Sequence, residues 1–137
     1  MNPAEPPSIA MLKRFPILVV LLVTVGQLIA APTPDLSVED QVQAILKEVR
    51  LKSERTDEGR TPDLQAELKA LDALYLAHRT EKTDAVGEIL VAKARLYLEV
   101  LDDARNGLTT FKRLANDLPE VSYIDGLRNA IANLERR

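Results

Sequence analysis

One stretch of the chain decides the fold. It runs from Thr83 to Pro119 and reads TDAVGEILVAKARLYLEVLDDARNGLTTFKRLANDLP. In residues 84–102 the apolar side chains cover more than one side of a helix, which indicates a helix packed between neighbours. In residues 104–118 they cover a single face. Asp102 and Asp103 leave room only for a tight turn, so we expect a hairpin of two antiparallel helices.

The residues before and after this hairpin show the same helical periodicity. Ser37 is a typical N-cap for a first helix. Its apolar stripe consists of Val38, Val42, Ile45, Leu46 and Val49. Residues 53–60 contain no apolar side chain and are predicted to form a loop. Thr61-Pro62-Asp63 combines a capping hydroxyl, a proline and an acid, which predicts the start of the second helix.

Three polar residues are predicted to begin the remaining helices. Thr83 and Asp103 are the expected N-caps of the two hairpin helices, and Ser122 is the expected start of the last helix. No segment alternates polar and apolar residues as a strand would. The sequence therefore predicts an all-α domain over residues 37–137, built as a short stack of about five helices in antiparallel hairpins.

Residues 1–31 have the three-part layout of a secretory signal peptide. Lys13 and Arg14 precede a long apolar run, and Ala30-Ala31 supplies small residues before a cleavage site. The competing interpretation is an uncleaved anchor over residues 17–31, although about 15 residues are fewer than the roughly 20 that cross a bilayer. A proline-rich linker, residues 32–36, follows. We expect a bacterial protein exported to the periplasm or beyond, or alternatively anchored in the inner membrane.

Composition excludes several classes of protein. The 137 residues suit one small folded domain, since 28% are charged and 46% are hydrophobic. The net charge is −3 with both signs interspersed, which argues against a nucleic-acid binder. There is no cysteine, so disulfides, thiolate metal sites and thiol catalysis are excluded.

The usual catalytic constellations are also missing from the sequence. His78 is the only histidine, and Tyr75 occupies the position where a Glu-x-x-His metal motif needs a carboxylate. The serines therefore lack a base and an orienting acid of the kind that nucleophilic catalysis needs. The glycines are scattered singly and form no phosphate-binding loop. The sequence predicts that the protein is not an enzyme and holds no metal or cofactor.

The central hairpin resembles a tetratricopeptide repeat, a helix pair of about 34 residues. The match covers one and a half repeats and a capping helix, residues 38–137. The resemblance implies close packing of the two helix backbones at two small residues, with an aromatic ring filling the gap below. The residues that carry it are Leu90, Ala94 and Tyr97 in the first helix and Gly107, Phe111 and Pro119 in the second.

A second resemblance is to the helical segment that precedes the thioredoxin-like domain in some secreted bacterial thiol oxidoreductases. It rests on residues 81–85, 96–98 and 102–103. The redox domain itself is missing, because the chain has no cysteine for its dithiol. Both resemblances imply a role in protein interaction or packing, and neither supplies a catalytic residue.

The leading hypothesis is an exported interaction module that binds a peptide, an envelope protein or a second copy of itself. We expect Val42, Ile45 and Val49 to lie at the centre of this contact, because their helix follows a linker and has few sequence neighbours to cover it. Alternatives are a membrane-tethered structural subunit, which would touch the membrane only through residues 17–31, and a carrier of a small ligand. No contact with nucleic acid is expected.

The predicted cleavage can be tested directly. If residues 1–31 are a signal peptide, the mature N-terminus will lie between Ala31 and Asp35. N-terminal sequencing of the exported protein measures it. Recovery of membrane-bound protein with residues 11–31 intact would show instead that this segment is an anchor.

Overall fold

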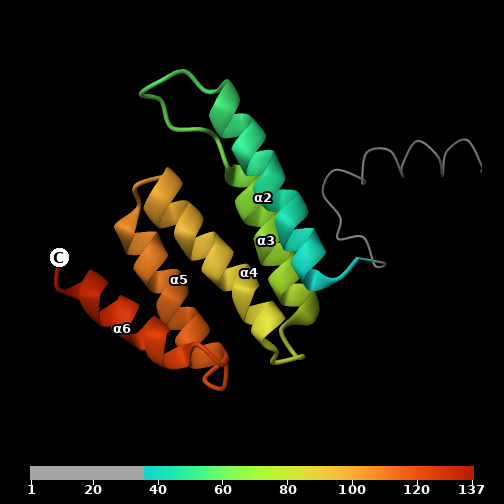
Figure 1. The fold of residues 1–137 in the computed structure, drawn as a ribbon, viewed down its shortest axis with the longest axis vertical. Helices are drawn as coiled ribbons and strands as arrows, with labels where there is room; N and C mark the ends of the chain where they lie inside the picture. Colours follow the sequence, from blue (N-terminus) through green and yellow to red (C-terminus); the bar gives the residue numbers. More distant parts are fainter. Residues whose placement is uncertain (1–35) are drawn as a thin grey trace, which may run out of the picture. The chain divides into compact units, whose positions relative to one another are not determined.

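The computed structural model describes residues 36–137, and within this range the chain is all helix and turn, without strands (Figure 1). The predicted all-α class is confirmed. The helices are α2 (Val38–Arg55), α3 (Gln65–His78), α4 (Asp84–Arg95), α5 (Ala104–Asp117) and α6 (Ile124–Glu135), with a π-helical segment, η1 (Leu96–Val100), continuing α4. The predicted signal segment and most of the predicted linker lie outside the described residues.

Helix α4 is at the centre of the packing. It contacts α2, α3 and α5, whereas α6 packs on α5 at the other side (Figure 1). Val86, Ile89 and Ala94 of α4 are completely buried, and Leu90 is nearly so. The wide apolar face of this helix is therefore covered from several directions, because its neighbours lie on both sides.

Local capping explains where three helices begin. The Ser37 Oγ atom accepts a hydrogen bond from the backbone N–H of Asp40 at 3.1 Å. The Thr83 and Asp103 side chains accept equivalent bonds from the backbone N–H three residues later, in α4 and α5, at 3.3 and 3.0 Å. These bonds satisfy backbone donors that have no partner within the helix. The three predicted N-caps are confirmed.

The predicted boundaries between α2 and α3 are wrong. Helix α2 continues to Arg55, through three residues that were expected in the loop. The Lys52 ammonium explains the extension, since it lies 2.8 Å from the carboxylate of Glu67 and holds the end of α2 against α3. Helix α3 begins only at Gln65, and Asp63 lies before it with its carboxylate accepting the Gln65 N–H at 3.1 Å.

The predicted start of the last helix is also wrong, for a tertiary reason. Ser122 does not cap α6, which begins at Ile124. Its backbone N–H and hydroxyl instead donate to the Asp84 carboxylate, at 2.9 and 2.5 Å. These two hydrogen bonds hold the pKa of Asp84 below its usual value. The connection between α5 and α6 is thereby tied to the first residue of α4.

The helix expected over residues 84–102 changes character at Leu96. The Leu101 N–H bonds to the Leu96 carbonyl at 3.0 Å, which is the wider i+5 spacing of a π-helix. The segment ends at Val100, and Asp102 adopts a positive φ of 49° in the turn. Helix α5 then runs back along α4, so the antiparallel hairpin is present with a shorter first helix than expected.

Gly107 lies at the closest approach of the hairpin. A Cβ atom there would lie 2.5 Å from the Leu98 Cγ and 3.3 Å from the Ala94 carbonyl oxygen. Ala94 and Phe111 are buried beside it, whereas Tyr97 is half-buried and Pro119 is exposed. The small side chains at 94 and 107 thus allow contact that a larger residue would prevent.

This contact predicts opposite effects at two glycines. Gly107→Ala should lower the free energy of unfolding by about 1–2 kcal/mol, because overpacking outweighs the gain in helix propensity. Gly126→Ala in α6 is the matched control: a Cβ atom there meets nothing within 4 Å. It should stabilise the protein by about 0.5–1 kcal/mol. Urea unfolding measures both, and equal stabilisation would contradict the tight packing at Gly107.

Candidate binding groove between α2 and α4

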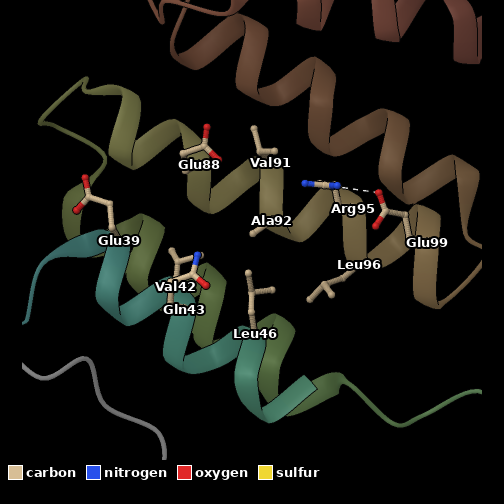
Figure 2. A pocket seen from close by; sticks show the side chains of 10 residues that line it. All are labelled: Glu39, Val42, Gln43, Leu46, Glu88, Val91, Ala92, Arg95, Leu96 and Glu99. Atoms are coloured by element: carbon tan, nitrogen blue, oxygen red, sulfur yellow. Dashed lines mark hydrogen bonds and ion pairs between the residues drawn. The ribbon is translucent and has the colours of Figure 1, made fainter. Parts of the chain in front are cut away.

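A groove with a cavity volume of about 290 Å³ lies between α2 and the continuous helix formed by α4 and η1 (Figure 2). Because α2 and α4 run in the same direction, their first turns lie at one end of it (Figure 1). The lining residues are Glu39, Val42, Gln43 and Leu46 from α2, Glu88, Val91, Ala92 and Arg95 from α4, and Leu96 and Glu99 from η1.

The middle of the groove is apolar. Val42 and Leu46 are one turn apart on α2, and the Ala92 and Leu96 side chains point towards them from the other helix (Figure 2). Val91 adds to the apolar lining from α4. Leu46 and Val91 are only partly buried, so solvent reaches this apolar surface. Such a surface gains free energy when another apolar group covers it, at about 25 cal/mol per Å².

The two ends of the groove differ in charge. At one end, Arg95 Nε lies 3.0 Å from Glu99 Oε1, and this ion pair neutralises both charges (Figure 2). At the other end, the carboxylates of Glu39 and Glu88 form no ion pair with any residue in 36–137. Both are exposed. The groove therefore has one acidic end and one neutral end.

The charge of Glu88 also acts on Tyr123, in the connection between α5 and α6. Burial, together with the negative charges of Glu88 and Asp84, raises the pKa of the Tyr123 hydroxyl well above its usual value.

The residues predicted to form the partner contact have different environments. Val42 lines the groove but is only 5% exposed, and Val49 is 6% exposed within the core. Ile45 is half-buried against the same core. Of the lining residues on α2, Leu46 is partly buried and Glu39 and Gln43 are exposed, so these three side chains are the ones open to solvent in the groove.

Sequence reasoning missed the contribution of α4 to this groove. Val91 extends the apolar surface of α4 beyond the part that α2 and α5 cover. The unusual width of this apolar surface in the sequence was the signal that could have indicated the groove. The position of Glu39 and Glu88 at the same end of the groove could not be predicted from the sequence. It depends on α2 and α4 running in the same direction, and α3 lies between them in the chain. The π-helical segment adds Leu96 and Glu99, and such segments are frequent at functional sites.

A second polar cluster ties α3 to α5. The Tyr75 hydroxyl donates to the Asp117 carboxylate at 2.7 Å, and the Arg113 guanidinium lies 4.8 Å from the centre of the Tyr75 ring. Burial, and then the hydrogen bond to Asp117, raises the pKa of Tyr75 to about 12. The cluster is compact and its groups are mutually satisfied, which is typical of a structural contact.

The single histidine is also engaged locally. His78 Nδ1 lies 2.6 Å from the carboxylate of Glu81 at the end of α3. Within residues 36–137 no three histidine, cysteine or acidic side chains gather closely enough to hold a metal ion. No helix in the same range combines the length and the apolar character needed to cross a membrane.

Comparison with protein-family models, with curated proteins and with solved structures finds no match to this chain. The groove and its chemistry therefore carry the functional argument.

The Tyr75 contact gives a prediction with a defined pH dependence. Tyr75→Phe should lower the free energy of unfolding at pH 7 by about 1–3 kcal/mol, since the hydrogen bond to a carboxylate is lost. Because the pKa of Tyr75 is raised in the folded state, the stabilisation by its hydroxyl is complete below pH 10 and is lost as pH rises towards 12. Denaturant unfolding measures the free energy of unfolding of the wild type and of Tyr75→Phe, and the difference between them should be smaller at pH 11 than at pH 7. A constant difference would contradict the raised pKa.

Proposed function

We propose that this chain is an exported, non-enzymatic helical module that binds a peptide or an exposed segment of an envelope protein in the α2–α4 groove. The observation that carries the proposal is the apolar middle of the groove, which Leu46 and Val91 leave open to solvent. Covering one such side chain contributes about 1.5–3 kcal/mol, so a few contacts suffice for reversible binding.

The order of the helices supports a tetratricopeptide-like arrangement. Helices α2 and α3 form one pair, and α4 and α5 form the next. The first helices of the two pairs lie side by side, since α2 contacts α4 (Figure 1). In stacks of helical hairpins, repetition of this contact creates an extended binding surface. The groove lies on the surface formed by these two first helices.

The dimensions of the groove favour a peptide over a small ligand. Its volume of about 290 Å³ lies at the lower limit of the range for small-molecule pockets, about 300–1,000 Å³. Its rim consists of exposed charged and amide side chains, which do not enclose a ligand. One or two apolar side chains fit such a space while the backbone that carries them stays outside.

The form in which the module is presented is a separate part of the proposal. Export rests on the signal-like residues 1–31, and the alternative of a tethered subunit rests on the apolar run over residues 17–31. Both alternatives present the same groove, so its binding can be tested without deciding between them.

The groove can be tested by cross-linking, because the chain has no native cysteine. Gln43→Cys places a single thiol on the groove, where a benzophenone maleimide can be attached. Irradiation in envelope extract should give a discrete adduct. Adding Leu46→Glu should lower the yield of the adduct at least tenfold, because the charged side chain disrupts the apolar middle of the groove.

The matched control is Leu76→Glu on α3, since Leu76 is 55% exposed and does not line the groove. This variant should keep the adduct. Circular dichroism must show both variants folded. An adduct that survives Leu46→Glu, or that Leu76→Glu removes equally, would refute binding in the groove.

A further inference from the structure

The charge distribution along the groove restricts what can occupy it. Glu39 comes from the first turn of α2 and Glu88 from the second turn of α4, so two different helices place carboxylates at one end (Figure 2). The opposite end carries the Arg95–Glu99 ion pair, whose two charges cancel. Between the ends, the lining is mostly apolar, and Gln43 is its polar member.

Each part of this arrangement selects a different part of a ligand. The apolar middle accepts aliphatic side chains and rejects polar ones, which would lose their hydrogen bonds to water. The Glu39 and Glu88 carboxylates, which form no ion pair with any residue in 36–137, attract a cation and repel an anion. This attraction acts mainly on the rate of association and on specificity, because both groups are exposed. A negatively charged peptide or an anionic lipid surface is disfavoured for the same reason.

We propose that the occupant of the groove is a cationic amphipathic peptide segment, with lysine or arginine at Glu39 and Glu88 and aliphatic side chains against Leu46 and Val91. This inference rests on the proposed function and specifies the chemistry of the partner. A peptide in which a cationic side chain is followed by a short apolar run matches the groove, because the acidic end of the groove is followed by its apolar middle. The neutral end at Arg95 and Glu99 requires no charge on that part of the peptide.

The probe is a twelve-residue synthetic peptide with two lysines at one end and leucine and alanine in the remainder. Its matched forms carry two glutamates or two glutamines in place of the lysines. Binding to the purified full chain is measured with an environment-sensitive dye on Gln43→Cys. The lysine peptide should bind at least tenfold more tightly than the glutamate peptide in 50 mM salt, and high salt should reduce this ratio.

Two double variants test whether the groove carboxylates are responsible. Glu39→Gln with Glu88→Gln should weaken binding of the lysine peptide about tenfold. The control, Glu48→Gln with Glu120→Gln, makes the same change in net charge at exposed acids outside the groove. It should change the affinity less than twofold, and circular dichroism should show both variants folded.

The outcomes separate this inference from the proposal on which it rests. Equal affinity for the three peptides, abolished by Leu46→Glu, would overturn the charge selection and leave groove binding intact. Equal weakening by the two double variants would show general attraction to an acidic protein, and would also overturn it. If no peptide changes the dye signal, the inference fails, whereas groove binding is judged by the cross-linked adduct alone.

Discussion

Burial of α4 is the constraint on which the rest of the structure depends. Its apolar side chains cover too wide an arc for one neighbour to bury, and α2, α3 and α5 all pack against it. Capping at Thr83 and the two hydrogen bonds from Ser122 to Asp84 then position the first turn of α4 against the connection between α5 and α6.

The candidate site is a consequence of this same packing. Helix α2 lies against α3 and α4 together, so it cannot cover the whole exposed side of α4. Val91 and Leu46 remain partly open at the edge of the contact. An apolar surface that the fold covers only in part can be covered further by another molecule. For this reason the residues of the proposed binding groove lie next to residues that stabilise the core.

Sequence reasoning succeeded where the controlling interactions are local. The caps at Ser37, Thr83 and Asp103 each bond to an N–H within three residues, so their side chains could be recognised from sequence. It failed at Ser122, whose partner is 38 residues away. For the site, the α2 stripe was correctly identified as apolar, but which of its members a partner can reach depends on the contact with α4.

The sequence by itself determined the all-α class, the central hairpin and three helix starts, because periodicity and capping act over one or two turns. Only the tertiary structure decided that Val49 lies in the core while Leu46 lines a groove, and that Glu39 and Glu88 share one end of it. The reason is that a helix has the same apolar stripe whichever neighbour covers it. The neighbour's position, set by burial of α4, decides which part of that stripe remains accessible.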